Sequence, residues 1–254
     1  MTALITGGTA GIGAMFARQL AARGEDLVLV ARDAERLASY ATELHRMYGV
    51  EVETLRADLA NRDDLATVAE RLGSTEHPID ALVNNAGFGM HSNMLTEDVA
   101  REELAIDVMC KAVLVLANAA ARAMKPRGRG RIINTSSTAG YITMGHYSAI
   151  KAYVTTYSEA LATQLEGTGV TVTALCPGWV HTEFHERAGI DPSKIPSAAW
   201  IDADVLVREA IADAASGRVI SIPTPQWKAA ILLARLAPRP AIRWVSRKLG
   251  SARH

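Results

Sequence analysis

Thr6-Gly7-Gly8-Thr9-Ala10-Gly11-Ile12-Gly13 is the stretch that decides the fold. It follows the apolar run 3–5 and leads directly into a helical pattern from Gly13 to Arg23. Glycines let the backbone turn tightly and approach a pyrophosphate, and a helix N-terminus offers free N–H groups and the positive end of its dipole. The stretch therefore predicts a dinucleotide site rather than a plain strand-to-helix turn, with these contact residues: Gly7, Thr9, Ala10, Gly11, Ile12 and Gly13.

Short apolar runs alternate with helical patterns along the rest of the chain. A run at 27–30 precedes a helical pattern at 34–48, and further runs lie at 50–55, 81–83, 131–133, 170–175 and 218–222. Continuous Val, Ile and Leu runs, apolar on both faces, are typical of a parallel sheet covered by helices on each side. We therefore predict an α/β fold, a single doubly wound Rossmann-type domain with a parallel sheet of about seven strands and helices on both faces.

The composition is that of an ordinary globular protein. The chain has 254 residues, of which 49% are hydrophobic and 21% charged, which excludes disordered, collagenous and coiled-coil chains. Lys plus Arg and Asp plus Glu each number 27, so the net charge gives no sign of a nucleic-acid partner. The distribution is uneven, because residues 214–254 hold eight bases and no acid, which leaves 19 bases against 27 acids in residues 1–213.

The cysteines and the N-terminus bear on the cellular compartment. Cys110 and Cys176 lie in apolar surroundings, which favours two reduced, buried thiols in a reducing cytoplasm. The N-terminus lacks the basic segment of a signal peptide, and the apolar run 112–121 is about half a membrane span. We therefore expect a cytoplasmic protein. We expect no metal site, because His181 and His185 have no evident third ligand.

Two regions depart from the alternation of strands and helices. Residues 183–202 follow a strand end, where open α/β sheets bind ligands, and we interpret them as a substrate lid rather than a linker. Residues 223–254 carry two short, basic, amphipathic helical patterns. For this C-terminal extension we favour packing on the body or on a partner subunit. The alternatives are a lid over the substrate and peripheral contact with an anionic membrane.

The end of the second strand bears on which nicotinamide cofactor binds. That strand is expected to end at Ala31, so that Arg32 follows it. A 2′-phosphate is usually met by an arginine here, and free ribose hydroxyls by an acid. Arg32 therefore favours NADP. NAD remains the alternative, because Asp33 would take the decisive position if the strand ran one residue further.

Over residues 1–222 the chain resembles the short form of the short-chain dehydrogenase/reductase family. Six motifs carry the resemblance in the family's order, and these are Thr6-Gly-x-x-x-Gly-x-Gly13, Asp58-Leu59, Asn84-Asn85-Ala86-Gly87, Ser136-Ser137, Tyr147-x-x-x-Lys151 and Pro177-Gly178-x-x-x-Thr182. The resemblance implies one catalytic domain at 1–222, a nicotinamide cofactor and a homo-oligomer paired through the helices near Lys111 and Tyr147.

The resemblance also implies roles for single residues. Asp58, flanked by Leu59, would contact the adenine. The adenosine ribose would be bordered by Asn85, Ala86 and Gly87, and the nicotinamide would be held by Pro177, Val180 and Thr182.

Tyr147, Lys151 and Ser137 form the expected catalytic set. By resemblance Tyr147 is the general acid/base, Lys151 its partner and Ser137 the hydroxyl that polarises the carbonyl. Tyr147 and Lys151 are four residues apart, so on a helix they share a face and their tips can approach each other and a ribose. A phenol has a reference pKa of about 10, and a nearby ammonium and a positive nicotinamide ring are expected to lower that pKa.

Two positions depart from the family pattern. Met109 stands where the family usually has an Asn that anchors a helix kink and a water in the proton path. The segment from Ser137 to Tyr147 is 10 residues long, where the family commonly has about three more. These departures motivate an alternative function, a cofactor-binding sensor or scaffold with little turnover.

The residues expected around the nicotinamide are apolar and aromatic, with few charges, and they are Phe88, Met90, His91, Tyr141, Ile142, Met144, His146, Trp179, His181, Phe184 and Trp200. Such a lining favours a hydrophobic ketone, aldehyde or secondary alcohol over a sugar phosphate or an acid, although half of these residues could be simple core. The sequence therefore predicts an NADP(H)-dependent oxidoreductase of a small hydrophobic carbonyl compound.

Overall fold

A seven-stranded parallel sheet organises the chain in the computed structural model, which describes residues 1–90, 94–181 and 197–251. The strands lie in the order β3 (Val52–Arg56), β2 (Asp26–Ala31), β1 (Thr2–Thr6), β4 (Ala81–Asn84), β5 (Gly130–Thr135), β6 (Val170–Leu175) and β9 (Ile220–Ser221). The order reverses between β1 and β4, which pair with each other. The predicted doubly wound α/β fold is therefore confirmed, with a switch point at the carboxyl ends of β1 and β4.

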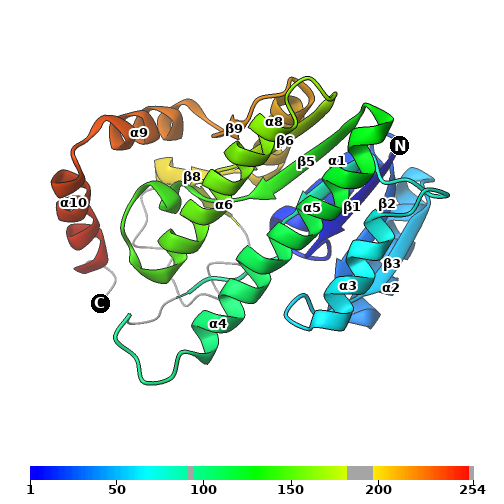
Figure 1. The fold of residues 1–254 in the computed structure, drawn as a ribbon, viewed down its shortest axis with the longest axis horizontal. Helices are drawn as coiled ribbons and strands as arrows, with labels where there is room; N and C mark the ends of the chain where they lie inside the picture. The colour runs from blue at the N-terminus through cyan, green and yellow to red at the C-terminus, as the bar shows by residue number, and fades with distance from the viewer. Residues whose placement is uncertain (91–93, 182–196, 252–254) are drawn as a thin grey trace.

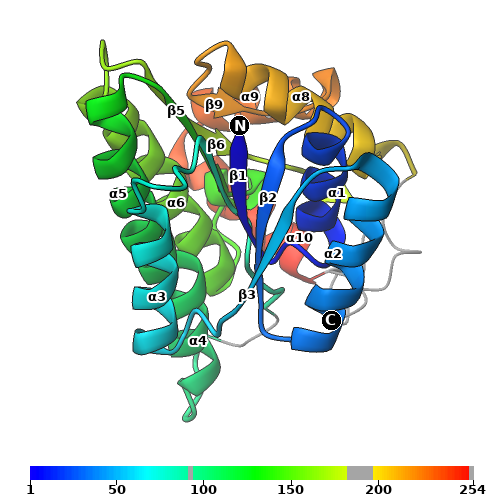
Figure 2. The ribbon, with the colours of Figure 1, turned by 90° about the vertical axis from the view of Figure 1, so that its right-hand side faces the viewer.

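Helices cover both faces of the sheet, as Figure 2 shows. One layer holds α1 (Gly11–Ala21), α2 (Ala34–Tyr48) and α8 (Ala203–Ala215), and the other holds α3 (Arg62–Leu72), α5 (Ala112–Met124) and α6 (Gly145–Gln164). Alternate residues of one strand face opposite layers, since Leu27 and Leu29 join the core under α1 and Val28 joins the core under α5. Edge strand β3 differs from the expected apolar run, because all five of its residues are at least partly exposed.

A long composite helix leads towards the middle of the molecule. It consists of α4 (Ala100–Ile106), a π-helical turn η1 (Asp107–Lys111), α5 and a short 3-10 turn η2 (Lys125–Arg127). The span Ala100–Arg127 is long and apolar enough to cross a membrane by length and composition, but 44% of its most apolar stretch is buried. Within this span, α5 packs on α3 and on β5.

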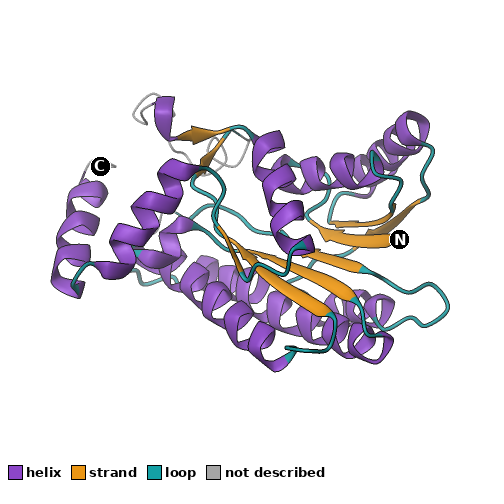
Figure 3. Ribbon diagram, turned by 90° about the horizontal axis from the view of Figure 1, so that it is seen from above, coloured by secondary structure: helices purple, strands orange, loops and turns teal. Residues whose placement is uncertain are grey.

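The remaining elements gather beyond the carboxyl ends of the strands. They are the 3-10 turns η3 (Thr138–Tyr141) and η5 (Ser197–Ala199), the short paired strands β7 (Trp179–Val180) and β8 (Trp200–Ile201), and the helices α9 (Pro225–Leu236) and α10 (Arg239–Ser251). The two helices predicted for the extension are confirmed. They lie at the end of the molecule opposite the N-terminus in Figures 1 and 3.

Candidate active site

The glycine turn after β1 has a backbone conformation and close contacts that leave no room for larger side chains. Gly7 and Gly11 have positive φ angles of 65° and 50°, a region that glycine adopts without strain. A Cβ atom at Gly13 would overlap the carbonyl oxygen of Gly7 and would lie 2.5 Å from Asn85 Nδ2. Ala10 precedes α1 without a side-chain cap. The first N–H groups of α1 are therefore presented to the turn, as binding of a pyrophosphate requires.

Thr6 joins this turn to the next strand. Its Oγ1 accepts hydrogen bonds from the backbone N–H groups of Asn85 (3.0 Å) and Ala86 (3.1 Å). In return, Asn85 Nδ2 donates to the carbonyl oxygen of Thr6 at 3.2 Å. The structure thus brings the Asn85 segment against the glycine turn, as the cofactor roles require. Sequence analysis gave Thr6 no role, although a hydroxyl at the last position of a buried strand was the available signal.

The end of β2 has the expected register. The strand ends at Ala31, and Arg32 is exposed directly after it. Asp33 caps α2, because its carboxylate accepts the backbone N–H of Arg36 at 3.0 Å. Ala31, the last residue of β2, is therefore followed by Arg32, while Asp33 already serves as the cap of α2.

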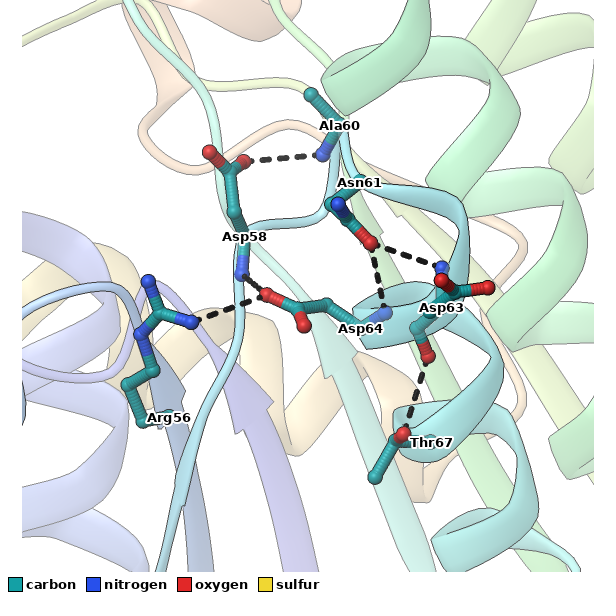
Figure 4. A network of polar contacts seen from close by, with 7 residues as sticks. All are labelled: Arg56, Asp58, Ala60, Asn61, Asp63, Asp64 and Thr67. Atoms are coloured by element: carbon teal, nitrogen blue, oxygen red, sulfur yellow. Dashed lines mark hydrogen bonds and ion pairs between the residues drawn. The ribbon is translucent and has the colours of Figure 1, made fainter.

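A polar network fixes the segment after β3 (Figure 4). The backbone N–H of Asp58 donates to Asp64 Oδ2 at 2.7 Å, and Asp58 Oδ1 accepts the N–H of Ala60 at 3.1 Å. Arg56 lies 3.5 Å from the same Asp64 oxygen. Leu59 is buried in the core beneath α3 and α5, so only its main chain could border an adenine.

The three expected catalytic residues come together at the carboxyl end of β5. Tyr147 and Lys151 lie one turn apart on α6, with Lys151 Nζ 5.6 Å from the centre of the Tyr147 ring. Lys151 Nζ also donates to the carbonyl oxygen of Thr135 at 2.8 Å. A side-chain hydrogen bond joins Ser137 and Tyr147. The short segment between Ser137 and Tyr147 therefore leaves the two hydroxyls in contact.

Burial dominates the titration of this group. It raises the pKa of Tyr147 to about 12, against a smaller lowering effect of the hydrogen bond with Ser137. It also lowers the pKa of Lys151 to about 8. In the protein alone, burial thus keeps the pKa of Tyr147 raised, and the expected lowering by the lysine and a positive nicotinamide ring together stays a prediction. A phenolate in this site loses more solvation than the hydrogen bond with Ser137 returns.

Buried hydroxyls and amides hold α6 against the sheet. Ser136 Oγ donates to the carbonyl oxygen of Lys151 at 2.7 Å and lies 2.7 Å from Thr155 Oγ1. A second chain of bonds joins β4, β5 and α6, from Asn84 Nδ2 to Asn134 Oδ1 (2.9 Å) and from Asn134 Nδ2 to Ser158 Oγ (3.0 Å). These contacts fix the rotation of the helix that carries Tyr147 and Lys151. Sequence analysis did not assign them.

Met109 lies within the π-helical turn η1 and is fully buried. The turn closes by a bond from the N–H of Ala112 to the carbonyl oxygen of Asp107, and a Cβ at Gly87 would lie 3.0 Å from Met109 Sδ. The irregular helix that the family associates with an Asn therefore forms here around a methionine, because the apolar side chain fills the space between Gly87 and α6. Cys110, expected to be buried, is only half-buried, whereas Cys176 is fully buried.

The segment after β6 forms the other wall of the site. The carbonyl oxygen of Pro177 accepts the Ser137 hydroxyl at 3.4 Å and the N–H of Thr138 at 3.0 Å. Val180 is buried where β7 pairs with β8. Thr182, the last expected nicotinamide contact, lies outside the described residues, as do His91, Phe184, His185 and residues 183–196 of the expected lid.

The C-terminal helices reach this wall. Trp227 of α9 packs on Gly178 so closely that a Cβ there would overlap the indole, and Trp227 Nε1 donates to the carbonyl oxygen of Ala199 at 3.1 Å. Ser246 of α10 accepts the N–H of Thr143 at 3.0 Å, within the short segment between Ser137 and Tyr147. The inner faces of both helices therefore pack on the body, as the favoured interpretation of the extension predicted.

Comparisons with known proteins agree with this geometry. The protein-family model for short chain dehydrogenases matches residues 1–192. An uncharacterized oxidoreductase from Staphylococcus saprophyticus is 35% identical over 206 residues, 78% of this chain and 88% of that protein.

Among solved structures, a short-chain dehydrogenase from Sphingobium yanoikuyae in complex with NADPH has a TM-score of 0.84 and 36% identity over 92% of this chain and 93% of that one. A bulky-bulky ketone specific alcohol dehydrogenase from Comamonas testosteroni has a TM-score of 0.80 and 31% identity over 92% and 91% of the two chains. The chain is therefore an oxidoreductase that belongs to the short-chain dehydrogenase family.

Proposed function

We propose that the protein is an NADP(H)-dependent oxidoreductase that reversibly reduces a small hydrophobic ketone or aldehyde to the alcohol. The observation that carries the proposal is the contact of Ser137, Tyr147 and Lys151 at the carboxyl end of β5. This group lies at the carboxyl end of β5, one strand from the switch point between β1 and β4, where doubly wound folds bind their ligands. The glycine turn that fits a pyrophosphate belongs to the same edge.

Each side chain has a defined task in this proposal. Tyr147 Oη donates its proton to the carbonyl oxygen of the substrate, and its raised pKa keeps that proton in place at neutral pH. Ser137 Oγ holds the same oxygen by a hydrogen bond. Lys151, held by the carbonyl oxygen of Thr135, orients the tyrosine and the cofactor ribose. The bound nicotinamide supplies the hydride to the carbonyl carbon.

The preference for NADP rests on Arg32. It follows β2 directly, and its guanidinium suits a 2′-phosphate, whereas Asp33 already caps α2. The Sphingobium neighbour, whose structure holds NADPH, supports this choice. NADH is expected to bind more weakly than NADPH.

The proposal of a hydrophobic substrate depends on the residues that line the site. Phe88, Met90 and Met109 pack with Tyr147 in one apolar cluster, and the ring of His181 stacks on Trp200 with 4.2 Å between centres. An apolar wall with few charges favours a substrate that leaves water readily. The bulky-ketone enzyme from Comamonas is a relative of the same kind.

The first test is a fluorescence titration with NADPH and NADH, followed by turnover of bound NADPH against hydrophobic ketones and aldehydes. We expect Tyr147→Phe to lower turnover by a factor of about 100 to 10,000 with little change in NADPH affinity. Tyr153→Phe, two turns along α6 and partly exposed, is the matched control and should retain the rate. Tight NADPH binding without turnover of any carbonyl compound would favour the sensor or scaffold, and absence of binding would overturn both functions.

We also propose a homo-oligomer that pairs through α5 and α6. Ile106, Leu114 and Tyr153 expose apolar surface there, around a shallow groove of about 480 Å³ that also holds Cys110. A second copy would cover this face. Light scattering should give at least a dimer, and Leu114→Glu should yield monomers. A monomeric wild-type chain would contradict the proposal.

A further inference from the structure

The outer face of α9 carries an apolar stripe without a partner among the described residues. Leu232, Leu233 and Leu236 are 59%, 69% and 76% exposed. The same helix turns Trp227 and Ile231 inward against the body, so it is already anchored through its other face. Three neighbouring leucines in water are unusual on a soluble surface and indicate an interaction site.

Helix α10 repeats this division into an inner and an outer face. Ile242 and Ser246 are buried, whereas Trp244 is 53% exposed. Lys248 Nζ lies 4.5 Å from the centre of the Trp244 ring, and Arg243 and Arg247 are exposed beside it. A tryptophan among long basic side chains is the arrangement found where a protein meets the boundary between lipid headgroups and acyl chains.

The charge of these two helices has one sign. Residues 214–254 hold eight bases and no acid. Lys228 lies 3.8 Å from Glu209 of the body, and within the part of the chain that the structure describes Arg239, Arg243 and Arg247 form no ion pair. The positive charge of these three arginines is therefore available to an anionic surface.

We call α9 and α10 together the C-terminal arm. We propose that the outer faces of these two helices dock on an anionic lipid bilayer. The leucines would enter the acyl boundary, Trp244 would lie at headgroup depth, and the bases would reach the phosphates. A protein partner is the alternative occupant, because arginine and tryptophan are also enriched in protein interfaces, and the experiments below separate the two. A second copy already has a different apolar face available on α5 and α6.

The arm also lies beside the candidate active site, beyond the carboxyl ends of the strands in Figures 1 and 3. Docking would bring the wall formed by Thr143 and Gly178 close to the membrane, where hydrophobic carbonyl compounds concentrate. This consequence rests on the proposed function. Vesicle binding is measured without substrate, so the two proposals can fail separately.

The test uses the full chain and two kinds of vesicle, phosphatidylcholine alone and phosphatidylcholine with phosphatidylglycerol. We expect the protein to sediment with the anionic vesicles, less with the neutral ones, and less still as salt rises. Equal binding to both kinds, or binding to neither, would overturn the proposal.

Two variants and their controls locate the surface. Leu232→Gln/Leu233→Gln/Leu236→Gln and Arg243→Gln/Arg247→Gln/Lys248→Gln should each weaken binding to anionic vesicles about tenfold or more. The controls Met47→Gln and Arg23→Gln/Arg46→Gln/Arg62→Gln change exposed residues of the body and should bind like the wild type.

Circular dichroism should show every variant folded. If the arm variants bind vesicles normally, the arm is not the docking surface. If they have a lower oligomeric mass in light scattering without vesicles, the arm is a subunit contact. Either result would overturn the proposal.

Discussion

Gly13, in the turn after β1, and Gly178, in the wall after β6, both lie where a larger side chain would not fit. The reason differs between the two positions. At Gly13 the obstruction would come mainly from the backbone of Gly7. At Gly178 it comes from the side chain of Trp227, 49 positions along the chain. The first requirement belongs to the local turn, whereas the second exists only because the C-terminal arm folds over the site. A local requirement recurs wherever this turn occurs, and a long-range one depends on the particular extension.

Gly13→Ala should have the largest effect, because backbone cannot move aside as a side chain can. We expect the affinity for NADPH to fall about 100-fold or more, measured by fluorescence titration. Gly73→Ala is the control, since a Cβ there would meet its nearest atom only at 3.4 Å. Unchanged NADPH binding in Gly13→Ala would show that this turn does not hold the cofactor.

Gly178→Ala should be harmful only while Trp227 is present. We expect kcat/KM for the carbonyl substrate to fall by about 10- to 100-fold in Gly178→Ala, because the added methyl displaces the indole from the wall. In a Trp227→Ala background the same change should cost much less. A double-mutant cycle measures this rescue, and strictly additive effects would contradict the long-range origin of the glycine.

Lys151 belongs to the catalytic set, and its lowered pKa makes a prediction about pH. The amine is charged below about pH 8 and loses its charge above that value. Tyr147, whose pKa is about 12, keeps its proton over this range. The rate of carbonyl reduction should therefore fall about tenfold per pH unit above pH 8. Thermal unfolding at each pH controls for stability, and a rate that stays level to pH 10 would rule out a role for the ammonium.

Sequence analysis could predict what depends on local backbone geometry. The parallel sheet, the end of β2 at Ala31 and the proximity of Tyr147 to Lys151 follow from apolar runs and helical spacing, and the structure agrees. The raised tyrosine pKa could not be predicted, because burial in three dimensions decides it. The helix irregularity around Met109 was equally hidden, since the fold forms it without the side chain expected there.

The arm itself shows why the substrate wall is the hardest part to predict. The arm contacts the site through single hydrogen bonds between residues that are far apart in the sequence. Thr143 and Ser246, for example, are 103 positions apart. No spacing rule links two such positions, whereas the spacing of four between Tyr147 and Lys151 places them on one helix face. Recognition of a substrate wall therefore requires the packed structure.

Ser246→Ala should have the smallest effect. The change removes one hydrogen bond to the backbone of the segment between Ser137 and Tyr147, worth about 1 kcal/mol, so we expect KM for the carbonyl substrate to rise up to about fivefold. The affinity for NADPH should stay the same, because the glycine turn lies elsewhere on the sheet edge. Ser216→Ala, at the exposed end of α8, is the control for loss of a serine hydroxyl that bonds to its own helix. If Ser246→Ala weakens NADPH binding as strongly as substrate binding, the arm acts on both regions, and the separation between a local cofactor turn and a long-range substrate wall does not hold.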